Sequence, residues 1–179
     1  MARFVVFLRS INVGGHTVKM DELRRIFESI GFSNVATVIA SGNLIFESSS
    51  RNQIGFEQKI QVNLKKALGY EVAAFVRSID EISKVAEYRP FPKMAEGAGL
   101  YIAFLPDLPH KTVMTKLLSL QTKTDNFHFH GRELYWLCHT RFSDSPFSGP
   151  KLEKILGVET TVRNSNTVMK IAAEYSPSH

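Results

Sequence analysis

Two spacings of apolar residues alternate along the first 77 residues of the chain. Phe4–Leu8 is an unbroken apolar run, which predicts a short strand buried on both faces. Over Met20–Ile30 the apolar residues recur every three or four positions, which predicts a helix with one buried face. A second helix with the same spacing is expected over Phe56–Leu68, and another strand is expected over 72–76.

A β-hairpin is expected between these two helices. Val35–Ala40 and Leu44–Glu47 have the composition of strands, and they flank the polar break Ser41-Gly42-Asn43. Such a break between two apolar runs predicts a hairpin turn. The resulting order is strand–helix–strand–strand–helix–strand, which is the order of a ferredoxin-like unit.

The same order is predicted again after a connector. Ser78–Glu81 has the form of a capping box, so a short helix should run to about Glu87 and should stop before Pro90. The second half then offers a strand at 100–105, a helix from Pro109, two strands around Gly131-Arg132, a helix from Ser148 to Leu156, a strand at 159–162 and a helix capped by Asn164. An internal duplication is the economical explanation.

The predicted fold class is therefore α+β, with two tandem ferredoxin-like (βαββαβ-type) repeats packed into one compact unit. We assign residues 1–77 to the first repeat and 78–98 to a short helix and connector. Residues 99–179 form the second repeat with its C-terminal helix.

Alternation in the second predicted hairpin separates two kinds of face. If Gly131-Arg132 is the turn, His130 lies opposite Glu133 and His128 lies opposite Tyr135. The face that carries Phe127, Phe129, Leu134, Trp136 and Cys138 should be covered by helices. The face with the histidines is polar and aromatic, and is expected to be either solvated or half covered by the other repeat.

Charge and cysteine content narrow the function classes. The chain carries 22 Lys and Arg against 17 Asp and Glu, a net charge of +5 that is spread along the sequence without a basic block. This permits nucleic-acid binding but only weakly supports it, because that function needs clustered charge. The single cysteine, Cys138, excludes an internal disulfide and favours the cytoplasm. Neither a membrane-spanning run nor a secretory signal is present, so no membrane association is expected.

Motifs of known chemistry are missing. The sequence has no phosphate-binding P-loop, no dinucleotide fingerprint, no zinc-protease motif and no nucleophile elbow. His128, His130 and His139 invite a metal site, but no further clustered ligand accompanies them, and Cys138 belongs to the opposite face. We predict no metal and no cofactor, and the sequence leaves open whether the protein is an enzyme.

The segment between the first strand and the first helix is the strongest candidate for a binding site. Gly14 and Gly15 free the backbone to approach a ligand, and the amides at the start of the following helix can hold an anion. Side-chain donors accompany them at Arg9, Asn12, His16 and Lys19. Against this, acidic residues in the first helical turn would repel an anion, and a glycine pair can serve only to turn the chain.

Two further polar clusters are candidates to join this site. In a ferredoxin-like unit the loop after the first strand and the hairpin turn lie at the same edge of the sheet. Ser41, Gly42 and Asn43 should therefore lie beside the glycine loop. Arg163 and Asn164 stand at a strand-to-helix junction, where an arginine can meet a phosphate. Capping of the last helix is the more common role of such residues.

Three segments together resemble an uncharacterised bacterial family, the domain-of-unknown-function family 1697 (DUF1697). They are Phe7-Leu8-Arg9-Ser10-Ile11-Asn12-Val13-Gly14-Gly15 with Lys19-Met20, Ala40-Ser41-Gly42-Asn43 with Phe46, and Leu156-Gly157-Val158 through Arg163-Asn164 to Asn166-Thr167-Val168. The family pattern usually has Gly at the position of Ser10 and an aromatic residue at that of Ser165. The resemblance implies a duplicated ferredoxin-like fold and implies no activity. Its pattern falls on the three polar clusters described above.

The leading hypothesis is a binding module for an anionic or phosphate-bearing small molecule at the Arg9–Lys19 loop and the Ser41–Asn43 turn. An enzyme at the same loops, with His16 as general base and Arg9 as electrostatic stabiliser, is the first alternative. A protein-interaction module, a homodimer among the options, or a nucleic-acid-binding module using an open sheet face is the second.

Overall fold

A computed structural model describes residues 1–12 and 14–177, apart from the side chains of Ala40 and Ser41. Where a single compact unit was expected, residue contacts divide the chain into two. The first unit comprises Met1–Ser83 with Ile171–His179, and the second comprises Lys84–Lys170. The repeat ranges 1–77 and 99–179 stay predictions about the sequence.

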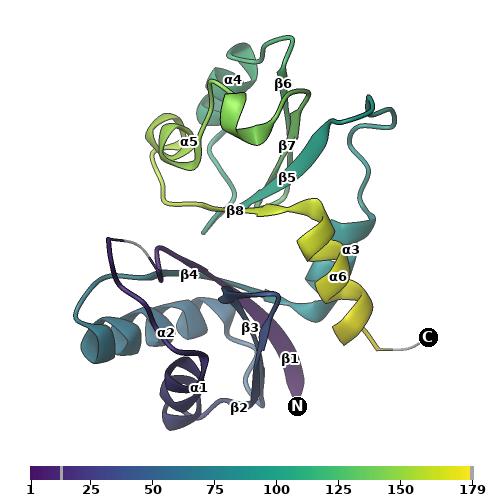
Figure 1. The fold of residues 1–179 in the computed structure, drawn as a ribbon. Coiled ribbons are helices and arrows are strands. Elements are labelled where there is room, and N and C mark those ends of the chain that lie inside the picture. The colour runs from purple at the N-terminus through teal and green to yellow at the C-terminus, as the bar shows by residue number, and fades with distance from the viewer. Residues whose placement is uncertain (13, 178–179) are drawn as a thin grey trace. The chain divides into compact units, whose positions relative to one another are not determined.

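The first unit is a four-stranded antiparallel sheet in the order β2-β3-β1-β4, with two helices on one face (Figure 1). Its elements are β1 (Ala2–Arg9), α1 (Met20–Ser29), β2 (Ser33–Val38), β3 (Ala40–Ser48), α2 (Gln53–Leu68) and β4 (Ala73–Ser78). This order of elements and strands is ferredoxin-like, so the predicted fold class is confirmed.

The second unit repeats this topology with the strand order β6-β7-β5-β8. Its elements are β5 (Gly99–Phe104), α4 (Lys111–Ser119), β6 (Asp125–His130), β7 (Glu133–Cys138), a 3₁₀ turn (Phe142–Asp144), α5 (Gly149–Leu156) and β8 (Thr161–Asn164). Replacing β1 to β4 by β5 to β8 reproduces the first order, which supports a duplication.

Two helices cross the boundary between the units in sequence. These are α3 (Ile79–Glu87) and α6 (Ser165–Tyr175). The predicted capping box opens α3, because the Glu81 amide donates to Ser78 Oγ at 3.2 Å and the Ser78 amide donates to Glu81 Oε2 at 2.8 Å. The last turn of α6 belongs to the first unit, where Arg3 donates to the carbonyl oxygen of Tyr175 at 3.1 Å. No helix in the described ranges has the length and apolarity needed to span a bilayer.

The core of the first unit lies between the sheet and helices α1 and α2. Phe4, Phe46 and Phe56 form part of an aromatic cluster there, with ring centroids 5.1–5.7 Å apart. The opposite side chains of β1, Val5 and Phe7, are also fully buried. The predicted strand buried on both faces is therefore confirmed.

The predicted hairpin turn at Ser41-Gly42-Asn43 is wrong. The chain reverses at Ile39, whose φ is 67°, and residues 41–43 belong to β3. Thr37 pairs with Leu44 while Val38 pairs with Ala40, so 41–43 form a bulge in the ladder between β2 and β3. Asn43 Nδ2 donates to the Val38 carbonyl oxygen at 3.2 Å, which holds the bulge against the turn. A reversal at a β-branched residue has no signal in turn propensities, which favour the segment that contains Gly42.

The second hairpin has the predicted register. His130 pairs with Glu133 and His128 with Tyr135, and Trp136 lies in the core under the helices. The polar-aromatic face is partly covered by the connector after α3. The Tyr88 ring stacks on His130 with centroids 3.8 Å apart, and its hydroxyl lies 2.8 Å from His128 Nε2.

A buried carboxylate ties this hairpin to the following loop. Asp125 is fully buried and accepts hydrogen bonds from Trp136 Nε1 at 2.8 Å, Ser145 Oγ at 2.6 Å and Thr124 Oγ1 at 2.8 Å. Burial raises the pKa of Asp125, but the hydrogen bonds from Ser145, Trp136 and Thr124 outweigh it. The net pKa therefore lies below its ordinary value.

We expect Asp125→Asn to destabilise the protein at neutral pH by about 1–3 kcal/mol, because three donors lose a charged acceptor. A lowered folded-state pKa contributes stability above the unfolded pKa of about 3.9, and this contribution disappears as the pH falls through the folded value. Urea unfolding followed by Trp136 fluorescence should therefore show a smaller difference from wild type at pH 3 than at pH 7. An equal difference at both pH values would contradict the role of the charge.

Replacing Ile39 by glycine should stabilise the first unit. A β-branched residue at positive φ is strained, and the Ile39 side chain is 60% exposed, so little packing is lost. We expect Ile39→Gly to raise the free energy of unfolding by about 0.5–1 kcal/mol, after the entropy cost of glycine is subtracted. Ile54→Gly, at an exposed isoleucine in the first turn of α2, is the control and should destabilise. A loss of stability in Ile39→Gly would show that the turn is not strained.

Candidate functional site

The last residue of β1 and the segment that leads to α1, together called here the amino-terminal loop (residues 9–19), are anchored at two buried residues. Ile11 and Val18 are 5% and 6% exposed and belong to the core of the first unit. Asn12 Oδ1 accepts a hydrogen bond from the Val18 amide at 3.0 Å, which closes the intervening residues into a compact loop. The Asn12 side chain, predicted as a ligand donor, is therefore used at least in part to shape the loop.

A tyrosine from outside the loop holds its far side. The Tyr70 hydroxyl donates to the Ile11 carbonyl oxygen at 2.6 Å, and the Tyr70 ring stacks on His16 with centroids 4.1 Å apart. Burial, and then the charge of Glu22, raise the pKa of Tyr70, so the hydroxyl stays a donor at neutral pH. The sequence offered no signal for Tyr70, because it follows α2 and lies far from the loop in the chain.

The backbone of the amino-terminal loop adopts left-handed conformations. Gly14 and Gly15 are exposed and have φ of 63° and 81°. Ser10 also has a positive φ, 64°, at the position where the family pattern usually has glycine. Val13, within the predicted motif, lies outside the described residues.

Strand pairing brings the amino-terminal loop next to the bulge of β3. Phe7 pairs with Asn43, so residues 41–43 continue beside the end of β1 where Arg9 stands. Arg9 Nη1 donates to Ser10 Oγ at 3.1 Å. Asn43 is 2% exposed, and its amide is directed to Val38 as described above. The prediction for the Ser41 side chain falls outside the described residues.

The amino end of α1 differs from those of the other helices. Lys19 stands at its N-cap, and no side chain caps the helix. Side-chain oxygen or nitrogen atoms of Asn52, Ser78, His110, Ser148 and Asn164 cap α2, α3, α4, α5 and α6. The Glu22 and Leu23 amides both donate to the Lys19 carbonyl oxygen at 3.1 Å. Within 1–12 and 14–177, the first-turn amides of α1 that have no acceptor are therefore those of Met20 and Asp21, next to the exposed residue Lys19.

Arg163 and Asn164 belong to the second unit, so their relation to the amino-terminal loop stays a prediction. Arg163 Nη1 donates to Thr161 Oγ1 at 2.6 Å and to the Val162 carbonyl oxygen at 3.0 Å. Burial lowers the pKa of Arg163 to about 10. Asn164 Oδ1 accepts from the Asn166 amide at 2.8 Å, which is the predicted capping role.

The three histidines and the cysteine that the sequence singled out lie in the second unit. Among the described residues no group of three or more potential ligands could hold a metal ion. His139 Nε2 lies 2.8 Å from Asn126 Oδ1, and Tyr88 contacts both His128 and His130. Cys138 is buried, with its Sγ 3.3 Å from the Thr140 carbonyl oxygen. Each of the three histidines and Cys138 therefore contacts other residues of the second unit.

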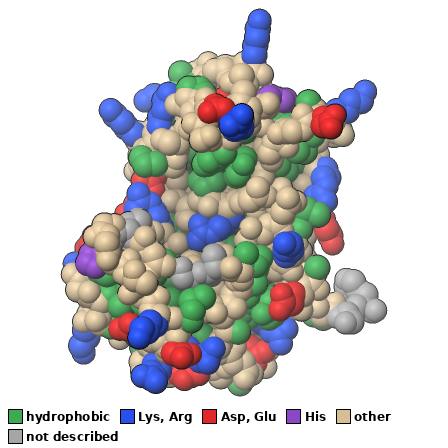
Figure 2. Space-filling view, viewed as in Figure 1, with side chains coloured by type: hydrophobic (Ala, Val, Ile, Leu, Met, Phe, Trp, Pro, Cys, Tyr) green, Lys and Arg blue, Asp and Glu red, His purple; other side chains and the backbone are tan. Residues whose placement is uncertain are grey.

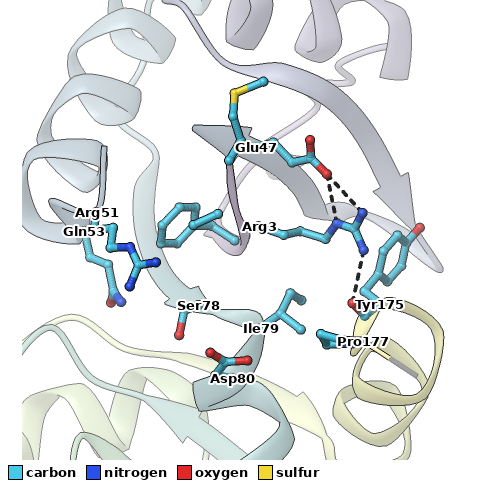
Figure 3. A pocket seen from close by; sticks show the side chains of 12 residues that line it. Arg3, Glu47, Arg51, Gln53, Ser78, Ile79, Asp80, Tyr175 and Pro177 are labelled. Atoms are coloured by element: carbon cyan, nitrogen blue, oxygen red, sulfur yellow. Dashed lines mark hydrogen bonds and ion pairs between the residues drawn. The ribbon is translucent and has the colours of Figure 1, made fainter. Parts of the chain in front are cut away.

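The opposite end of β1 borders a cavity of about 560 Å³ that the sequence did not indicate (Figure 3). We call it the first-unit cavity. On its lining, Arg3 Nη2 donates a hydrogen bond to Glu47 Oε1 at 3.0 Å and forms an ion pair with it. Hydrogen bonds from Asn34 and then Arg3 hold the pKa of Glu47 below its ordinary value. The side chains of Arg51 and Asp80 face the same space in Figure 3 and form no hydrogen bond or ion pair within the described ranges.

These cavity residues were missed because each is an ordinary charged residue at the end of an element. Only the strand order places the start of β1, the end of β3 and the end of β4 at one edge. Elsewhere Lys and Arg side chains are spread over the face shown in Figure 2 and are not gathered into a patch, as the sequence distribution suggested.

The two sheets with their helices define a tandem ferredoxin-like α+β protein, and comparisons with known proteins agree. The fold is similar to that of the conserved bacterial protein SP0830 from Streptococcus pneumoniae, with a TM-score of 0.72 and 22% identity over 96% of this chain and 97% of that chain. No curated protein matches the sequence.

Residues 1–135 match the sequence profile of the family described as "Protein of unknown function (DUF1697)". The chain therefore belongs to this family, as the resemblance indicated, and the first two of the three segments lie within the matched range.

Asn12 provides a test of loop closure. Asn12→Ala leaves the buried Val18 amide without this acceptor, which should cost about 1 kcal/mol and lower Tm by about 2–4 °C. Asn12→Asp keeps the acceptor and serves as the matched control. Hydrogen exchange at the Val18 amide should accelerate in Asn12→Ala and not in Asn12→Asp. Equal exchange in both variants would show that the loop is held by other contacts.

Proposed function

We propose that the protein is a cytoplasmic binding module for an anionic small molecule, a phosphate- or carboxylate-bearing one, at the amino-terminal loop. The site consists of the loop, the first-turn amides of α1 and the adjacent bulge of β3. The single observation that carries the proposal is the amino end of α1, which lacks a side-chain cap and stands next to exposed basic and glycine residues.

The amino end of α1 favours the binding of an anion through two effects. The Met20 and Asp21 amides are hydrogen-bond donors without an acceptor in the described residues, and the aligned peptide dipoles place partial positive charge there. Lys19 adds a full charge at the N-cap position. His16 adds a ring whose orientation is set by Tyr70.

The backbone of the loop supports close approach of a ligand. Gly14 and Gly15 have no side chain between the backbone and solvent, and both are exposed. Ser10 and Ile39 are non-glycine residues at positive φ, one in the loop and one at the turn before the bulge. Strained residues persist only where the surrounding structure holds them in place, and they often occur at functional sites.

Acidic residues in the first turn of α1 weaken the binding of an anion but do not abolish it. Asp21 lies 3.6 Å from Arg24 on the same helix, which offsets its charge. Glu22 remains a repulsive neighbour, so we expect modest affinity. Catalysis at the loop has less support, because His16 forms no hydrogen bond within the described residues to a group that would orient it as a base.

A ligand screen by thermal shift tests the proposal. Inorganic phosphate, nucleotides and phosphorylated metabolites are the probes. A ligand present at about 100 times its Kd stabilises by about 2.7 kcal/mol, so Tm should rise by about 5–10 °C. Arg9→Ala and Lys19→Ala should each reduce this shift, because each removes a positive charge from the site.

The control variant is Arg51→Ala, which removes the same charge from the first-unit cavity at the other end of β1. It should keep the full shift. A shift lost in Arg51→Ala and kept in Lys19→Ala would place the ligand in the cavity and would refute the proposed site. No shift with any probe would refute the function.

A further inference from the structure

The second unit contains a pocket of about 230 Å³ on the sheet face opposite to its helical core. Ile102 of β5 and Tyr135 of β7 contribute to its lining and are 1% and 0% exposed. Phe91 and Met94 of the connector and Met169 of α6 add to the apolar lining. All of these residues belong to the second unit.

The pocket has the composition of a site for a flat ring. The Tyr135 hydroxyl donates to the Val85 carbonyl oxygen at 3.0 Å, so its polar group is satisfied inside the protein. Aromatic rings and methionine sulfur are favourable neighbours of an aromatic ligand, and methionine adapts to its shape. A cavity of about 150 Å³ binds benzene, so this pocket has room for a somewhat larger ring system.

An arginine is held beside this apolar lining. Arg89 Nη1 donates to the carbonyl oxygens of Ala86 and Tyr88, which orients the guanidinium. Its other N–H groups form no hydrogen bond within the described residues, although Arg89 lines the pocket. An oriented guanidinium with remaining donors is suited to a carboxylate.

The first turn of α6 adds polar groups. Ser165 and Asn166 line the pocket, and their side chains form no hydrogen bond among the residues that the structure describes. The Asn166 backbone amide is already used by Asn164, so these side chains, and not the helix end, are the available partners.

We propose that this pocket binds a small aromatic carboxylate. The ring lies among Phe91, Met94, Met169 and Tyr135, and the carboxylate meets Arg89 with Ser165 or Asn166. This site is separate from the amino-terminal loop, because it uses other residues, another unit and an apolar ligand class.

NMR titration of the full chain with indole-3-acetate, indole and cyclohexylacetate separates the contributions of ring and charge. A ligand of this size should bind with a Kd of about 1 mM or lower. Indole lacks the carboxylate and should bind at least about tenfold more weakly, since a hydrogen bond to a charged group is lost. Cyclohexylacetate should also bind more weakly, because it lacks the aromatic face.

Variants locate the site. Arg89→Met should weaken indole-3-acetate by about tenfold and leave indole unchanged, and Lys116→Met on α4 removes the same charge elsewhere and should have no effect. Ser165→Phe should block both indole ligands by filling the pocket. Met169→Trp, at a 43% exposed residue, repeats this test if Ser165→Phe does not fold. Absence of binding, equal binding of indole and indole-3-acetate, or loss of binding in Lys116→Met would overturn the proposal.

Discussion

Strand β1 is hydrogen-bonded on both sides, to β3 and to β4, and is buried from Phe4 to Leu8. A strand in this position cannot shift by one residue without exposing its entire apolar set and breaking two ladders. Its two ends are therefore fixed points of the first unit. The amino-terminal loop leaves from one end, and the first-unit cavity with Arg3 borders the other.

The fixed register of β1 also brings together polar residues that are far apart in the sequence. The pairing of Phe7 with Asn43 brings the bulge of β3 beside Arg9, and the pairing of Arg3 with Glu47 sets up their ion pair. Three extra residues in β3 are accommodated only as a bulge, because the pairs on both sides are held by β1 and by the turn at Ile39. A bulge at this position aims its backbone out of the ladder, which is a common device next to binding sites.

The second unit shows what duplication preserves and what it changes. Strand order and hairpin pairing are repeated, and the helices again cover one face of the sheet. The loops differ: α4 is capped by His110 whereas α1 has no side-chain cap. The open face also differs, because Tyr88 and Phe91 cover its histidines and leave an apolar pocket beside them. Two binding proposals in one protein follow from these differences and not from the common fold.

The sequence by itself determined the elements, their order and the ferredoxin-like class, because apolar periodicity and helix caps are local signals. Ser78 with Glu81, Ser148 and Asn164 cap the helices whose starts they predicted. The sequence also predicted the position of the second hairpin and the family of the protein. Tertiary structure decided the reversal at Ile39, the stacking of Tyr70 on His16, and the cavities around Arg51 and Arg89. Each of these depends on strand register or on contacts between residues distant in sequence, and neither is encoded in the periodicity of any one segment.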